Sequence, residues 1–142
     1  MKKLIFALGI ILVTTSFTQA LAQCNTEKHV EACIPKLQDG FTFLKSYSID
    51  GEGGAKKKVE YSYVFTKGAT YQVMICNDGE STDGIVLTLY DSNRNPVATT
   101  KYQGSTLRAI TFPCQVTGIY YITYTFEGST NYCGGSVLGF KR

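Results

Sequence analysis

The chain has 142 residues, with 14 basic and 11 acidic side chains and a formal net charge of +3. A domain of this size buries about two-thirds of its unfolded surface, which is enough for one core of its own. The small net charge argues against nucleic acid as a partner, because that function requires clustered basic residues.

The chain begins with a segment typical of a cleavable secretory signal, residues 1–22. Lys2 and Lys3 precede an apolar run over 4–13, and the segment ends in the small-residue pattern A-L-A. The apolar run is shorter than the about 20 residues that cross a membrane, so we expect no membrane span. Once these 22 residues are removed, 12 basic side chains face 11 acidic ones, a net charge of +1.

A competing interpretation of the same region concerns Cys24. The sequence Leu21-Ala22-Gln23-Cys24 resembles a lipoprotein box, in which the cysteine carries lipid. Such a box has Gly, Ala or Ser before the cysteine, whereas this chain has Gln23. We therefore favour cleavage after Ala22 and a secreted or periplasmic protein, with a lipid anchor on Cys24 as the alternative.

Export determines how the cysteines are interpreted, because disulfides persist outside the cytosol. No two cysteines form a C-x-x-C pair, and His29 is the sole histidine, so we expect neither a zinc site nor a redox site. Two structural bridges and one leftover thiol are favoured, in any of fifteen arrangements, since five choices of free thiol each leave three pairings. The cysteines are Cys24, Cys33, Cys76, Cys114 and Cys133.

A short helix is predicted over residues 26–37, where apolar side chains recur at helical spacing. Asn25 or Thr26 can cap its start, and an Asp-Gly pair ends it. Cys33 would lie about 10 Å along such a helix, too far for an easy bridge to Cys24. Cys33 is therefore expected to fasten the helix to the rest of the fold.

From Phe41 onward the hydrophobic pattern has period two, and each alternating segment ends at turn residues, as in a β-sandwich. The fold class is therefore all-β: a sandwich of seven to eight antiparallel strands over residues 41–142, preceded by a helical segment over 23–40. The expected strands begin or lie at 41–44, 59–65, 71–76, 85–89, 97–102, 110–114, 118–126 and 137–140.

Several strand motifs occur in a distinctive order between residues 59 and 126. Residues 61–71 read YSYVFTKGATY, similar to Y-x-F-x-x-x-x-G-x-x-Y, and 86–93 read VLTLYDSN, similar to L-x-L-Y-D-x-x-G. Residues 110–112 (ITF) and 117–122 (TGIYYI) are similar to i-x-F and T-G-x-Y-y-I. Together they resemble the motifs of bacterial pre-peptidase C-terminal (PPC-like) domains.

This resemblance implies a jelly-roll-like sandwich. PPC-like domains are usually appended to secreted hydrolases and are thought to help secretion or substrate attachment. The present chain departs from them in having no attached enzyme and in adding a helical segment and cysteines. It is similar in form to short stand-alone secreted proteins of Bacteroidota-type bacteria.

The resemblance also implies which cysteines are joined. In a meander of this kind, the end of strand 118–126 lies beside the start of strand 85–90. The loop after Phe126 then comes near the loop after Cys76, which favours a bridge between Cys76 and Cys133. Cys114 would pair with one of the two N-terminal cysteines, Cys33 or Cys24.

Catalytic chemistry lacks the residues it requires. A Ser-His-Asp triad would have to use His29, which we expect on the surface of the helix. Cys114 with His29 would form a thiol pair without an activating neighbour, and the acidic residues fall mostly in loops or at strand ends. We therefore expect that the protein is not an enzyme.

Two loops carry oxygen ligands at a spacing that calcium sites use. The central glycine and closing glutamate of an EF-hand are missing, and Asx side chains that bond to their own backbone explain such loops as well. No metal is therefore favoured and no cofactor is expected, with calcium as a weak alternative. The weak calcium candidates are Asp78, Glu80, Asp83, Asp91 and Asn93, with Asn95 beside them.

Tyrosines on exposed strand faces are the remaining candidates for a site. Tyr90 and Tyr121 are predicted opposite the core-facing positions, where aromatic rings bind sugars or proteins but also serve as ordinary strand residues. The first hypothesis is a secreted, non-enzymatic module that binds a surface ligand, either polysaccharide or an envelope protein. The alternatives are a structural protein that self-assembles or joins an exported complex, and a calcium-dependent binding module.

Overall fold

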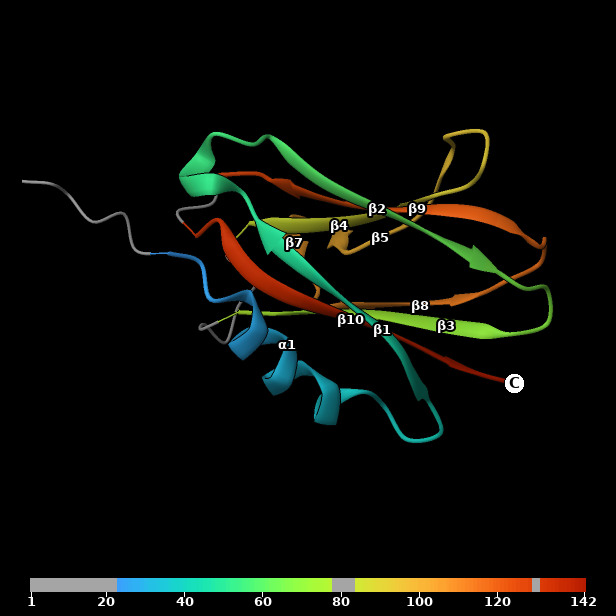
Figure 1. The fold of residues 1–142 in the computed structure, drawn as a ribbon. Helices are drawn as coiled ribbons and strands as arrows, with labels where there is room; N and C mark the ends of the chain where they lie inside the picture. The colour runs from blue at the N-terminus through green and yellow to red at the C-terminus, as the bar shows by residue number, and fades with distance from the viewer. Residues whose placement is uncertain (1–22, 78–83, 129–130) are drawn as a thin grey trace, which may run out of the picture.

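The computed structural model describes residues 23–77, 84–128 and 131–142 and contains two antiparallel sheets packed face to face (Figure 1). One sheet has the strand order β1-β10-β3-β8 and the other β2-β9-β4-β5, while β6 and β7 form a separate hairpin. The predicted all-β sandwich is confirmed. The strands are β1 (Thr42–Asp50), β2 (Lys58–Phe65), β3 (Thr70–Cys76), β4 (Ile85–Tyr90), β5 (Pro96–Thr99), β6 (Lys101–Tyr102), β7 (Ser105–Thr106), β8 (Ala109–Pro113), β9 (Gly118–Phe126) and β10 (Cys133–Lys141).

The core forms between the sheets because every second side chain of the central strands points inward. In β9, Tyr120, Ile122 and Tyr124 are buried, and the residues between them point to the outer side of the sheet. Ile85 of β4 lies opposite Phe126 of β9, which confirms the predicted neighbourhood of these strands.

The predicted strand over 97–102 is wrong in one respect, because it is interrupted at Thr100. The side chain of Thr100 is fully buried, and its backbone N–H donates to the carbonyl of Leu87 at 2.9 Å. Its hydroxyl oxygen accepts a hydrogen bond from the Leu87 N–H, also at 2.9 Å. These bonds end β5 and turn the chain outward into the hairpin of β6 and β7.

The outer face of the sheet β1-β10-β3-β8 is covered by helix α1 (Thr26–Cys33) (Figure 1). The helix starts at Asn25, whose side-chain oxygen accepts a hydrogen bond from the Lys28 N–H at 3.2 Å. It continues as a short 3₁₀ turn (Ile34–Lys36), so the predicted helical segment is present and changes type before its end. A second 3₁₀ turn (Glu52–Gly54) connects β1 to β2.

Close approach between helix and sheet depends on Gly135 of β10. A Cβ atom at this position would lie 2.6 Å from the backbone nitrogen of Val30 and 2.9 Å from the carbonyl carbon of His29. No ordinary side chain fits at such distances, so a glycine is required where the helix crosses β10.

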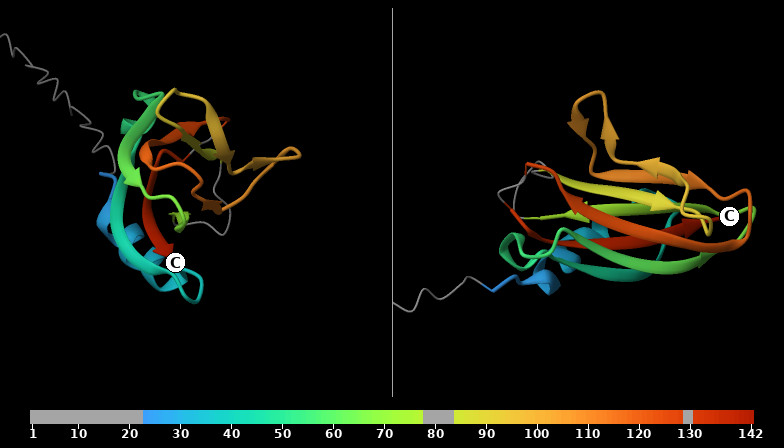
Figure 2. Two further views of the ribbon diagram at one scale, coloured as in Figure 1. Left: turned by 90° about the vertical axis from the view of Figure 1, so that its right-hand side faces the viewer. Right: turned by 90° about the horizontal axis from the view of Figure 1, so that it is seen from above.

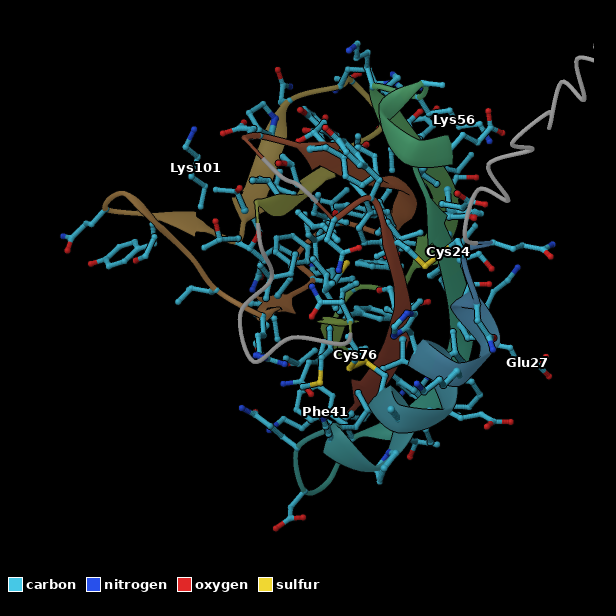
Figure 3. All side chains as sticks on the ribbon, turned by 90° about the vertical axis from the view of Figure 1, so that its left-hand side faces the viewer. Cys24, Glu27, Phe41, Lys56, Cys76 and Lys101 are labelled. Carbon is cyan, nitrogen blue, oxygen red and sulfur yellow. A yellow bond between two sulfur atoms is a disulfide. The ribbon has the colours of Figure 1, made fainter. Side chains whose placement is uncertain are left out.

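Two disulfides fasten this N-terminal segment to the sheet (Figure 3). Cys24 is bonded to Cys133, and Cys33 is bonded to Cys76. The expectation that Cys33 fastens the helix is therefore confirmed, and the predicted Cys76–Cys133 bridge is wrong. Gly135, and not Cys133, lies opposite Cys76, so Cys76 and Cys133 are offset by two residues. Each of them is bonded instead to a cysteine of the N-terminal segment.

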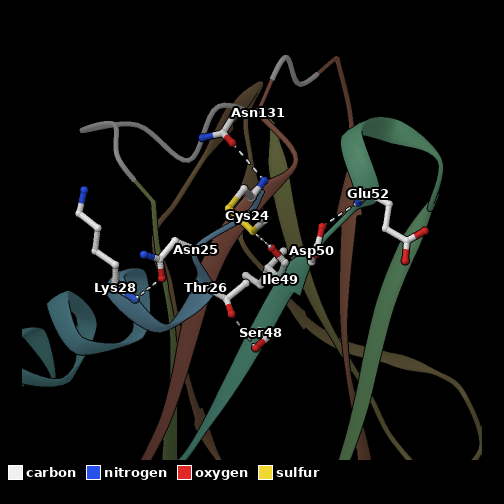
Figure 4. The surroundings of a disulfide bond; sticks show 10 residues. Cys24, Asn25, Thr26, Lys28, Ser48, Ile49, Asp50, Glu52 and Asn131 are labelled. Atoms are coloured by element: carbon white, nitrogen blue, oxygen red, sulfur yellow. Dashed lines mark hydrogen bonds between the residues drawn. A yellow bond between two sulfur atoms is a disulfide. The ribbon is translucent and has the colours of Figure 1, made fainter. Parts of the chain in front are cut away.

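Figure 4 shows the first of these bridges at the start of the N-terminal segment. The sulfur of Cys24 lies 3.6 Å from the carbonyl oxygen of Ile49, and the Cys133 N–H donates to the Asn131 side chain at 3.0 Å. Because the sulfur of Cys24 is bonded to Cys133, it is not available for a lipid, and this structure contradicts an anchor on Cys24.

Cys114 is a free thiol, which contradicts its predicted pairing with Cys33 or Cys24. It is buried between the two sheets, where its Sγ lies 3.1 Å from the carbonyl oxygen of Val116 and 3.8 Å from the hydroxyl of Tyr120. The N-terminal cysteines lie on the other side of the sheet and cannot reach it.

Among the described residues, no helix is long and apolar enough to cross a membrane.

Candidate binding surface

The outer face of the sheet β2-β9-β4-β5 has no helix of the described chain packed on it, unlike the outer face of its partner sheet (Figures 1 and 2). We call this surface the open face. It is built from the residues that alternate with the core positions of the strands. They are Lys58, Glu60, Ser62 and Val64 of β2, Ile119, Tyr121, Thr123 and Thr125 of β9, Val86, Thr88 and Tyr90 of β4, and Thr99 of β5.

The two tyrosines selected from the sequence are direct neighbours on the open face. Tyr90 and Tyr121 lie opposite each other in the pairing of β4 with β9, and both are partly buried. The prediction that they point away from the core is confirmed. The register of the sheet therefore places side by side two candidates that are 31 positions apart in the chain.

The turn between β4 and β5 brings the side chain of Arg94 to Tyr121, and the Asp91 carboxylate holds the turn together. The Asp91 carboxylate accepts hydrogen bonds from the backbone N–H groups of Asn93 and Asn95, both at 2.9 Å, and from the Asn95 side chain at 3.3 Å. The hydrogen bond from the Asn95 backbone is the largest cause that lowers the pKa of Asp91. Arg94, in the same turn, has a φ of 65°, and its side chain returns over the open face.

Two of the calcium candidates selected from the sequence, Asp91 and Asn93, lie in this turn and are hydrogen-bonded within it. Asp91 and Asn93 take part in an Asx turn, the alternative that the sequence left open. The remaining candidates, Asp78, Glu80 and Asp83, lie outside the described residues. Within the described ranges, no three His, Cys, Asp or Glu side chains are grouped so that they could hold a metal ion.

Arg94 is the centre of a polar cluster on the open face. Its guanidinium lies over the ring of Tyr121, with 3.6 Å between Cζ and the ring centroid, and Nη1 lies 2.8 Å from Oε1 of Glu60. The hydroxyl of Thr123 donates to the other oxygen of Glu60 at 2.7 Å. Desolvation would raise the pKa of Glu60, but these hydrogen bonds and the charge of Lys58 outweigh it and lower the pKa.

Beside this cluster the open face becomes apolar. Val64 and Ile119 lie opposite each other in the pairing of β2 with β9 and are 55% and 47% exposed. With Ser62 and Tyr63 they line a shallow hollow of about 440 Å³. Neither residue was selected from the sequence. The available signal was an aliphatic side chain at an outward strand position, where a polar residue is usual.

A second hollow, which we call the end cleft, lies between the Asp91–Asn95 turn and the connection from β8 to β9. Its volume is about 310 Å³. The rings of Phe112 and Tyr120 lie with their centroids 5.5 Å apart in its wall, and Val116 is 67% exposed at its edge. It also was not predicted. The complete lining is Asp91, Ser92, Asn93, Val97, Phe112, Gln115, Val116, Thr117, Gly118 and Tyr120.

The residues considered for catalysis are not brought together. His29 is buried in α1, with 5% of its surface exposed, so its predicted surface position is wrong. It belongs to the helix on the outer face of one sheet, whereas Cys114 lies between the two sheets. The sheet separates the two side chains, so they do not form a thiol–imidazole pair.

No protein family matches the sequence, and no curated protein does. Solved structures with a similar fold include the following two. The first is Aeromonas hydrophila PliG, a periplasmic lysozyme inhibitor of g-type lysozyme, at 15% identity and a TM-score of 0.44, covering 72% of this chain and 85% of that one. The second is the pre-peptidase C-terminal domain of collagenase from Bacillus anthracis, at 17% identity and a TM-score of 0.45, covering 71% and 89%. The similarity to these two structures concerns the fold alone.

Proposed function

We propose that this chain is an exported, non-enzymatic binding module and that the open face binds a protein of the cell envelope. The observation that carries this proposal is the asymmetry of the sandwich. One outer face is sealed by a helix and two disulfides, while the other presents Val64 and Ile119 to solvent beside a polar cluster. Exposed apolar side chains rimmed by polar ones are typical of interaction sites.

The chemistry of the open face favours a protein over a polysaccharide. Sugars bind to the exposed faces of aromatic rings, and one face of the Tyr121 ring is already covered by Arg94. The exposed apolar surface next to it comes from branched aliphatic side chains, which pack against other side chains. Arg94 and Glu60 supply charged partners at the edge of that apolar pair.

The export part of the proposal rests on residues 1–22 as a cleaved leader, with residues 23–142 as the functional domain. Two disulfides fit an oxidising extracellular or periplasmic compartment. In such a compartment the bridges that hold α1 on its sheet persist.

Site-specific photocrosslinking in the producing cells tests the proposal. A benzoylphenylalanine at Ser62, which is exposed on the open face opposite Tyr121, should give a discrete, protease-sensitive adduct. The same group at Glu31, exposed on α1, serves as the matched control and should give none. The added change Ile119→Asp should abolish the Ser62 adduct, since it places a charge in the apolar contact.

The outcomes separate the two classes of ligand. An adduct that resists protease and is removed by glycosidases would overturn the protein assignment in favour of a polysaccharide. Equal labelling from Ser62 and Glu31, or no adduct from Ser62, would overturn the open face as the binding surface.

A further inference from the structure

The hairpin of β6 and β7 projects from the side of the sandwich, away from both sheets (Figures 2 and 3). We call residues 100–107 the arm. Its turn contains Gln103 and Gly104, with φ values of 46° and 80°, the pair of positive angles that a tight two-residue hairpin requires. Tyr102, beside the turn, is 58% exposed.

The base of the arm is fixed to the sandwich. Thr100 is fully buried and bonded to Leu87, and the Leu107 N–H donates to the Thr100 carbonyl at 2.7 Å. Lys101 forms an ion pair with Glu127, with 2.5 Å between Nζ and Oε2. A short hairpin held at both strands presents Tyr102 in a defined position, which reduces the conformational entropy lost on binding.

The end cleft has the chemistry that accepts a tyrosine. Its apolar wall consists of Phe112, Tyr120 and Val116, and aromatic pairs prefer tilted or offset arrangements such as this wall allows. Ser92 and Asn93 at its rim supply polar groups for a phenolic hydroxyl. A ring with a polar end therefore matches an apolar cleft with a polar rim.

We propose that the arm of one copy of this chain inserts Tyr102 into the end cleft of a second copy. Both halves of the contact occur on the same chain, at different places on its surface. Residues 23–142 carry 12 basic and 11 acidic side chains, so a net charge of +1 opposes association of the copies only weakly. The open face takes no part, so this contact is independent of the proposed function.

The contact is heterologous, since an arm meets a cleft and not another arm. In a pair of copies, one copy has a free arm and the other has a free cleft. Further copies can therefore add at both ends, and pairs grow into longer assemblies. A buried aromatic contributes about 150–250 Å² per side chain, well below the about 1,200 Å² of stable complexes. Association is therefore expected to be weak and visible at high protein concentration.

Sedimentation velocity of residues 23–142, with both disulfides intact, tests this contact from about 10 μM to about 1 mM, the range of weak affinities. The sedimentation coefficient should rise with concentration. Tyr102→Ala and Val116→Asp should each weaken association at least about tenfold, as expected for loss of an anchor at an interface. Phe43→Ala, which removes an exposed aromatic ring on β1, away from the arm and the end cleft, is the matched control and should associate as the unaltered chain does.

Mixing the two defective variants gives the decisive measurement. The Tyr102→Ala copy retains its cleft and the Val116→Asp copy retains its arm, so the mixture should form pairs and no longer assemblies. A chain that stays monomeric at about 1 mM would overturn the proposal and leave the end cleft to a tyrosine of another protein. Association unchanged by Tyr102→Ala, or a mixture that fails to pair, would also overturn it.

Discussion

The guanidinium of Arg94 lies 3.6 Å from the centre of the Tyr121 ring while it is paired with Glu60 at 2.8 Å. One side chain from the turn after β4 thereby connects three strands of the open face. Arg94 adopts a positive φ, which is unusual for a residue with a side chain. The ring contact and the ion pair are the interactions that accompany this backbone conformation.

Replacing Arg94 with Ala should lower the denaturant midpoint of unfolding, because it removes both contacts and leaves Glu60 without its nearest cation. Arg94→Lys should restore less than half of the loss, since an ammonium group cannot lie flat on the Tyr121 ring while it pairs with Glu60. Arg142→Ala, at the exposed C-terminus, is the control for loss of one positive charge. Equal midpoints for Arg94→Ala and Arg142→Ala would contradict this role.

Glu60 should make the stability of the fold depend on acidic pH. Its pKa in the folded chain is lowered below the ordinary value of 4.5, so it stabilises the fold above that pH, and the contribution is lost as the pH falls through the folded pKa. Glu60→Gln should cost about 1 kcal/mol at pH 7, the net contribution of a typical hydrogen bond.

The measurement is the free energy of unfolding in urea at pH 7 and pH 3 for both proteins. The difference between them should shrink as the pH falls, because the carboxyl takes up a proton and then resembles the neutral amide. A difference of the same size at both pH values would show that the charge of Glu60 is not involved.

Gly135→Ala should destabilise the fold by about 1–3 kcal/mol, the usual cost of inserting a group into a packed interface. The added Cβ would lie 2.6 Å from the backbone of Val30, so α1 would have to move away from β10. Gly118→Ala is the matched control, because nothing lies within 4 Å of the new Cβ and the backbone there is not left-handed. It should change the stability by less than about 0.5 kcal/mol. Urea unfolding of the oxidised proteins compares the two.

The two disulfides should contribute unequally, and the shorter loop should contribute more. Chain entropy favours the Cys24–Cys133 bridge, with a separation of 109 residues against 43, by about 0.8 kcal/mol. Cys33 and Cys76 are fully buried, however, so replacing both with Ala also leaves a cavity that costs about 0.8 kcal/mol or more for each lost sulfur. Cys33→Ala/Cys76→Ala should therefore be more destabilising than Cys24→Ala/Cys133→Ala, in unfolding experiments without reductant.

The pairing itself is checked on the unaltered chain by alkylation and peptide mapping without reductant. One thiol, Cys114, should be labelled, and only after denaturation, because the side chain is buried. A linked peptide that contains Cys76 and Cys133 would contradict the structure.

Local chemistry was enough to predict the helix and most of the strands, although not the interruption at Thr100 or the hairpin of β6 and β7. Alternating side chains in β2, β4 and β9 determine both that these segments are strands and which side faces the core. Tyr90 and Tyr121 were placed on outward positions for that reason. The helix start at Asn25 was predictable as well, since capping involves residues three positions apart.

Contacts between distant residues were decided by the tertiary structure alone. The path of the N-terminal segment across the sheet determines that Cys24 and Cys33 reach Cys133 and Cys76, and it buries His29, for which the helical pattern gave no signal. The open face exists because α1 packs on the outer face of the other sheet, and the end cleft exists because the turn after β4 comes close to the connection from β8 to β9. A sequence pattern reports the side of a strand on which a residue lies, but what packs against that side depends on chain segments far away, and only the folded chain specifies them.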